Sequence, residues 1–132
     1  MNEYKYKALF CYKLGESISL KIKYLKRLQL EPGQCRIKVL SCGINYPDLL
    51  MLQGKYQHKP QLPFIPGMEI SGKVIEDYSK SNSLIGKKII ANIKTGGFAE
   101  EIIIEKENLL SFPFRYTNDQ AAAFPIVTQT AY

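Results

Sequence analysis

The chain has 132 residues, of which 45% are hydrophobic and 23% charged, a composition that fits one globular domain over residues 1–132. No apolar run approaches the roughly 20 residues of a membrane-spanning helix, and the N-terminus lacks the apolar stretch of a signal peptide. Three cysteines without a CxxC pair argue against a disulfide framework and against a cysteine-rich zinc site. We therefore expect a cytoplasmic protein with no membrane partner.

The formal net charge of +6 raises the question of a nucleic-acid partner, because clustered basic side chains can neutralise phosphates. The densest basic cluster consists of Lys21, Lys23, Lys26 and Arg27. Ile18, Leu20 and Ile22 alternate with this cluster, so we expect a half-buried strand whose lysines face solvent. No recognisable nucleic-acid-binding motif accompanies the cluster, and the sequence therefore predicts no nucleic-acid partner.

Short β-type segments dominate the chain. Each is rich in Val, Ile or Tyr, and polar or Gly- and Pro-containing connections separate them. The predicted strands are 4–12, 16–23, 35–40, 70–76, 87–93 and 98–104. Many short strands joined by such turns indicate a barrel or a sandwich.

Two short helices are predicted, at 47–53 and 117–124. The first is bounded by residues typical of helix ends, namely Asn45, Pro47, Asp48 and Gly54. The second begins at Thr117, and Gln120 completes a Thr-x-x-Gln capping box. After Pro125, residues 126–132 are expected to form the first turns of a third helix.

Three motifs in order along the chain carry a family resemblance. They are CGINYPD at 42–48, LPFIPGMEISG at 62–72 and TGGFAE at 95–100, with AAAFP at 121–125 and TAY at 130–132 downstream. With them, the chain resembles the N-terminal catalytic domain of zinc-free medium-chain dehydrogenases/reductases, in the NADPH:quinone oxidoreductase (zeta-crystallin-like) branch. The resemblance implies a mainly β fold, a GroES-like, partly open β-barrel with a few short helices.

The resemblance also bears on metal binding. In the zinc-dependent branch a cysteine occupies the position of Asn45 and a histidine that of Met68. A side-chain amide and a neutral thioether are poor zinc ligands, and the one histidine, His58, does not supply the three ligands that catalytic zinc needs. We therefore expect no metal site.

The resemblance implies roles for four residues. Asn45 and Asp48 would face the nicotinamide end of NADPH, Thr130 would reach it from the interdomain side, and Tyr56 would lie near the substrate carbonyl as the catalytic residue. From the residues alone, Asn45 and Asp48 are equally well explained as helix caps, and Tyr56 as a loop anchor. Glu69, which lies beside the metal in the zinc branch, is expected to accept structural hydrogen bonds.

Residues 1–132 contain no glycine-rich dinucleotide fingerprint, because the diglycine Gly96-Gly97 precedes a strand and not a helix. We therefore expect the catalytic half of an NADPH-dependent quinone oxidoreductase that transfers hydride to a quinone or enone. Without a Rossmann cofactor domain it would be inactive alone. We expect it to bind a separately encoded Rossmann partner, which would complete it, or to self-associate as a homo-oligomer. The alternative is a non-catalytic GroES-like remnant or interaction module from a split or decayed gene.

Overall fold

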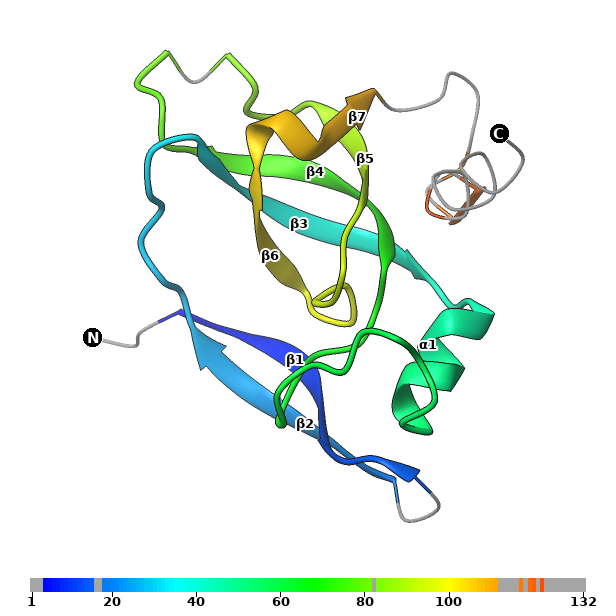
Figure 1. The fold of residues 1–132 in the computed structure, drawn as a ribbon. Helices are drawn as coiled ribbons and strands as arrows, with labels where there is room; N and C mark the ends of the chain where they lie inside the picture. The colour runs from blue at the N-terminus through cyan, green and yellow to red at the C-terminus, as the bar shows by residue number, and fades with distance from the viewer. Residues whose placement is uncertain are drawn as a thin grey trace.

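A computed structural model of the chain describes residues 4–15, 18–81, 83–111, 117, 119–120 and 122. Most of this part is β-structure, with one short α-helix and one 3-10 helix of defined bounds (Figure 1). The elements in chain order are β1 (Lys5–Lys13), β2 (Ser19–Lys26), β3 (Gln34–Gly43), α1 (Tyr46–Leu52), β4 (Glu69–Asp77), β5 (Lys88–Asn92), β6 (Glu101–Glu105), η2 (Lys106–Asn108) and β7 (Leu109–Ser111). The prediction of a mainly β fold is confirmed.

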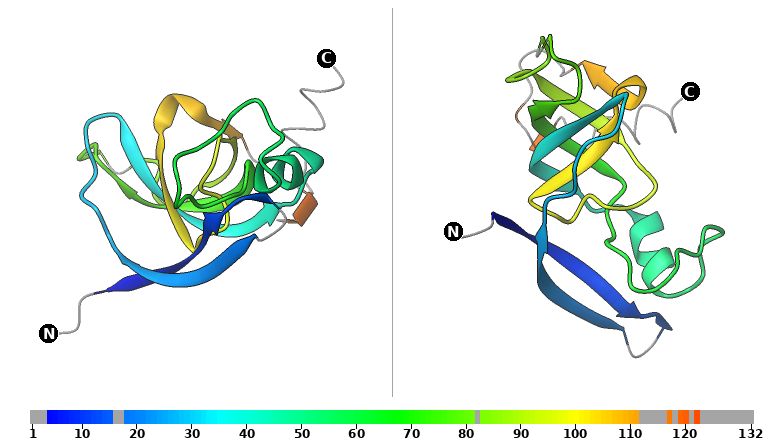
Figure 2. Two further views of the ribbon diagram at one scale, coloured as in Figure 1. Left: turned by 60° about the horizontal axis from the view of Figure 1, so that its bottom comes forward. Right: turned by 90° about the vertical axis from the view of Figure 1, so that its left-hand side faces the viewer.

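The strands form two antiparallel sheets. β1 and β2 make a two-stranded sheet, and the other five strands pair in the order β6-β3-β4-β5-β7. The β1–β2 hairpin forms a layer apart from the larger sheet (Figure 2). Backbone hydrogen bonds link it to the loops, from Leu9 N–H to Phe98 O at 2.9 Å and between Cys11 and Phe64 at 2.7 and 3.1 Å. Both sheets are open and do not close into a barrel.

Two apolar clusters follow from the alternation of side chains along these strands. The larger lies on the five-stranded sheet and consists of Cys35, Ile37, Ile70, Val74, Ile89, Ala91 and Ile104. The smaller joins Cys11 of β1, Met51 of α1 and Phe64 of the loop before β4. Through this second cluster, α1 and the following loop are packed against the hairpin.

The loop before β4 and the loop after β5 are joined along their backbones. The N–H groups of Gly96 and Phe98 donate to Ile65 O at 2.7 Å and Pro66 O at 2.9 Å, and Gly97 N–H donates to Gly67 O at 3.1 Å. Gly67 has φ of 107°, where a side chain is strained. These two loops hold the motifs at 62–72 and 95–100 against each other.

Both predicted helix starts are found. α1 spans Tyr46–Leu52, against the predicted 47–53. Gly54 follows its cap with φ of 73° and donates its N–H to Met51 O at 3.1 Å, as expected of a C-terminal glycine. Thr117 and Gln120 exchange hydrogen bonds of 3.0 and 3.2 Å, so the predicted capping box forms. Residues 119, 120 and 122 are helical. The rest of the predicted helix 117–124, and the helix predicted at 126–132, lie outside the described residues.

The prediction of a half-buried strand whose lysines face solvent is correct for the lysines and wrong for Ile18, Leu20 and Ile22. Their exposed fractions are 41%, 44% and 65%, and the lysines between them are exposed as well. The physical reason is that β2 pairs only with β1 among the described strands and that the hairpin is displaced from the larger sheet, so both faces of β2 reach solvent. The short strand β7 was not expected, because its three residues are too few for an alternation pattern.

Replacement of Gly67 by alanine should destabilise the chain more than the same replacement at Gly86. Both glycines have positive φ, 107° and 89°, so both variants carry backbone strain. At Gly67 the added Cβ would lie 2.8 Å from Gly97 Cα and from Phe98 N, whereas at Gly86 nothing lies within 4 Å. We expect Gly67→Ala to cost about 1–3 kcal/mol beyond the Gly86→Ala control in urea unfolding. Equal losses would contradict this account of the loop contact.

Candidate functional site

The N-terminus of α1 meets the start of β4 in a hydrogen-bonded cluster of polar side chains. Asn45 precedes the helix, and its Nδ2 donates to Glu69 Oε1 at 2.5 Å. Its backbone N–H donates to Asp48 Oδ2 at 2.8 Å. Gly43 permits this packing, because a Cβ there would overlap the Glu69 carboxylate. Helix capping and the contact to β4 thus fix Asn45 from both sides.

Asp48 and Glu69 are almost completely buried, with exposed fractions of 2% and 1%. The second carboxylate oxygen of Asp48, Oδ1, is buried and makes no hydrogen bond. Burial raises the pKa of Asp48, an effect that the backbone N–H groups of Asn45 and Gly67 partly oppose. A buried carboxylate oxygen without a donor is costly, so a donor that reached this atom would stabilise the fold.

Tyr56 belongs to a cavity of about 230 Å³ that follows α1. The cavity is lined by Met51, Tyr56, His58, Met68 and Lys94. Tyr56 and Met68 also pack on the smaller apolar cluster, which fixes the tyrosine ring. Met68 directly precedes Glu69, so the start of β4 contributes to both the cavity and the polar cluster.

The cavity combines hydrogen-bond donors with apolar walls. The phenol of Tyr56 and the ammonium of Lys94 can both donate to a ligand oxygen, while the methionine side chains offer adaptable apolar contact. Lys94 was not predicted as a site residue. It follows β5 closely, and the hydrogen bond of 2.7 Å from Ile93 N–H to Met68 O brings this segment to the cavity. Its only sequence signal is its position just before the TGGFAE motif.

Cys42 lies at the end of β3 beside this cluster but is unsuited to nucleophilic chemistry. Burial, with the nearby carboxylates of Asp48 and Glu69, raises the pKa of Cys42 to about 12. Its Sγ would lie 2.6 Å from a Cβ built at Gly97, so the thiol fills the space that this glycine leaves open. We therefore assign Cys42 a packing role.

Of the four residues predicted for the site, the structure describes three and brings two of them into contact. Asn45 and Asp48 contact each other, whereas Tyr56 lines the separate cavity. Thr130 lies outside the described residues.

Among the described residues, no group of three His, Cys, Asp or Glu side chains could hold a metal ion. Within the same part of the chain, no helix has the length and apolar character needed to cross a membrane.

Comparison with known proteins shows the family to which this chain belongs. The model of the alcohol dehydrogenase GroES-like domain matches residues 31–114, which is more than half of the chain. The chain belongs to this family. The expected resemblance to quinone oxidoreductases is also confirmed, by relatives in both sequence and structure.

Among the relatives of this GroES-like chain, a quinone oxidoreductase-like protein 2 homolog from Nematostella vectensis is 42% identical over 129 residues, covering 96% of this chain and 35% of the relative. The Bos taurus quinone oxidoreductase-like protein 2 is 37% identical, with 96% and 36% covered. The quinone oxidoreductase from Thermus thermophilus, solved also in complex with NADPH, aligns with a TM-score of 0.82 at 34% identity, over 96% of this chain and 39% of that one. The chain thus spans about a third of the length of its curated relatives.

Replacement of Asp48 by asparagine should stabilise the GroES-like chain at neutral pH. Because the folded pKa of Asp48 lies above its ordinary value of 3.8, the folded state holds the proton more tightly than the unfolded state. The free energy of unfolding of the wild type should therefore fall as pH rises from 3.8 through the folded pKa, and the Asp48→Asn variant should escape that fall.

Urea unfolding of both proteins between pH 3 and pH 7 measures the difference, with the exposed Glu107→Gln as a control that should not produce it. A variant that is less stable by the same amount at every pH would mean that the carboxylate serves the fold as a helix cap and nothing more.

Proposed function

We propose that residues 1–132 form the catalytic half of an NADPH-dependent quinone oxidoreductase, which transfers hydride to a quinone or an enone. The observation that carries the proposal is the buried Asp48 Oδ1 without a hydrogen-bond donor, beside the Asn45–Glu69 pair. The quinone oxidoreductase relatives, and the NADPH complex of the Thermus thermophilus protein, support it.

The residues present fit a nicotinamide cofactor. Asp48 Oδ1 can accept a hydrogen bond from a ribose hydroxyl. Asn45 Nδ2 donates to Glu69, and the Asn45 side-chain oxygen, which takes part in the capping box with the Asp48 backbone, retains a second lone pair for a hydroxyl or carboxamide donor. We propose Thr130 as a further cofactor contact. When bound, NADPH supplies the hydride, and these side chains orient it.

The substrate would occupy the cavity at Tyr56. The tyrosine hydroxyl donates a hydrogen bond to the carbonyl oxygen, which gains negative charge as the carbon is reduced. Lys94, on the same cavity wall, adds positive charge for that oxygen. Met51 and Met68 contact the apolar part of a quinone or enone ring.

Residues 1–132 contain no glycine-rich turn that could bind a pyrophosphate, so the main cofactor anchor must come from outside them. We propose that a Rossmann domain, in the same longer protein or separately encoded, supplies it, and that residues 1–132 alone are inactive. We place the protein in the cytoplasm, in keeping with its free cysteines.

The activity is tested by joining residues 1–132 to the remaining length of the Nematostella vectensis relative. We expect this chimera to oxidise NADPH with 1,2-naphthoquinone, whereas residues 1–132 alone should not. Tyr56→Phe should lower kcat about hundredfold, as the loss of one charge-stabilising donor does. Tyr78→Phe, at a half-exposed loop tyrosine, is the matched control and should leave kcat unchanged. A folded chimera that binds NADPH but reduces neither quinones nor enones would refute the proposed reaction.

The site is further proposed to work without zinc, because Asn45 and Met68 are poor ligands. Protein purified without chelator should hold less than stoichiometric zinc by elemental analysis. The double variant Asn45→Cys, Met68→His supplies a thiolate and an imidazole, so it should bind zinc more tightly than the wild type. Stoichiometric zinc in the wild type would overturn this prediction.

A further inference from the structure

The strands of the β1–β2 hairpin carry six positive charges, which equals the formal net charge of the whole protein. The two strands contain six lysines and no acidic residue. The chain has 18 basic and 12 acidic residues, so the remaining twelve basic residues equal the acidic residues in number. The hairpin is therefore a distinct basic surface on an otherwise balanced molecule.

The outer edge of β2 is an open strand edge. The opposite edge of β1 is covered, since Leu9 bonds to Phe98 and Cys11 bonds to Phe64. β2 pairs only with β1 among the described residues. Its outward backbone N–H and C=O groups are thus placed to bind one more strand.

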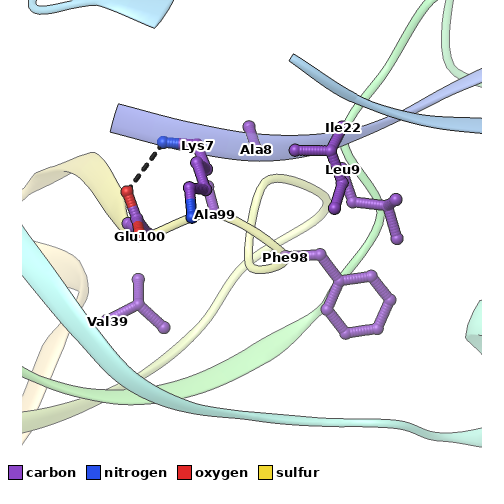
Figure 3. Close-up of a pocket in the computed structure, with 8 residues that line it drawn as sticks. All are labelled: Lys7, Ala8, Leu9, Ile22, Val39, Phe98, Ala99 and Glu100. Carbon is purple, nitrogen blue, oxygen red and sulfur yellow. Dashed lines mark hydrogen bonds between the residues drawn. The ribbon is translucent and has the colours of Figure 1, made fainter. Parts of the chain in front are cut away.

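The two faces of β2 differ in chemistry. In the hairpin register Ile22 lies opposite Leu9, and Leu20 opposite Cys11, on the face toward the larger sheet. There the hairpin and the larger sheet flank an apolar cavity of about 350 Å³ that is widely open to solvent, with Leu9 and Ile22 across from Phe98 and Val39 (Figure 3). Ile22 remains 65% exposed, so the edge of this cavity is not filled by the described chain.

The other face of β2 is basic. Lys21 and Lys23 are exposed there, and their Nζ atoms lie 5.7 and 5.5 Å from the ring centroid of Tyr12. Contact with this ring positions both ammonium groups on the same face of the sheet. A strand added to β2 would follow the same pleat, so its side chains would alternate between the apolar cavity and these two lysines.

We propose that the edge of β2 binds an extended segment of a partner protein in which apolar and acidic residues alternate. The apolar side chains of the segment pack beside Leu20 and Ile22, and its carboxylates lie next to Lys21 and Lys23. A second copy of the hairpin is a poor occupant, because lysines would then face lysines across the new pair. The same lysines that protect an open edge from self-association thus select an acidic strand.

Two peptides of identical composition test the proposal on the chain itself. One alternates valine with glutamate, and the other carries the same residues in two blocks, so that only the pattern differs. We expect the alternating peptide to shift the backbone NMR signals of residues 19–26 and to slow amide exchange there. The block peptide should bind about tenfold more weakly or less, since it cannot satisfy both faces at once.

Charge reversal supplies the second arm. Lys21→Glu with Lys23→Glu should bind the valine–glutamate peptide about tenfold more weakly, and should bind an alternating valine–lysine peptide instead. Lys73→Glu is the matched control, because Lys73 is also exposed but lies on β4 between two paired strands. It should leave binding of both peptides unchanged.

Each contrary outcome overturns the proposal. One such outcome is that the block peptide, or a single-stranded oligonucleotide of equal charge, binds the hairpin as tightly as the alternating peptide does. In that case the surface recognises negative charge without regard to pattern and is a polyanion site. If no peptide perturbs the NMR signals of β2, the lysines serve only to prevent self-association at the strand edge. If the valine–lysine peptide fails to bind the charge-reversed variant while the fold is intact, the lysines do not select the partner.

Discussion

The hydrogen bond from Asn45 Nδ2 to Glu69 Oε1 is the constraint on which the candidate site depends. It joins the N-terminus of α1 to the first residue of β4. Because Glu69 is buried, its carboxylate must be satisfied inside the protein, and Asn45 supplies a donor. The direction of the Asn45 amide follows, and with it the acceptor that remains for a ligand. Gly43 is required for this pair, since any side chain there would displace Glu69.

The loops around this pair are held by close backbone contact more than by side-chain packing. Gly67 and Gly97 approach so closely that neither tolerates a Cβ without displacement of a neighbour. Cys42 fills the space beside them, and its raised pKa is a consequence of that packing. The glycines in the motifs at 62–72 and 95–100 are therefore explained by geometry, without a direct role in chemistry. Their close contact holds together the two loops that lie beside the polar cluster and the cavity.

Local rules predicted the parts of this structure that short stretches of sequence determine. Helix α1, the glycine at its end and the capping box at Thr117 follow from residue types three or four positions apart, and all were confirmed. The alternation in β2 predicted the strand but not its environment, because burial depends on what lies beyond the hairpin. Lys94 was missed for the same reason, since only the pairing of its segment with Met68 brings it to Tyr56.

The two proposed binding surfaces both contain unsatisfied hydrogen-bonding groups, but they differ in what those groups cost. Asp48 Oδ1 is shielded from water, so its missing partner destabilises the free chain until a donor arrives. The edge of β2 is exposed, and water can bond its backbone groups at little cost. A ligand at Asp48 should therefore stabilise the fold strongly for few contacts. A strand on β2 must gain its affinity from side chains, which is why the alternation of apolar and basic residues there decides what can bind.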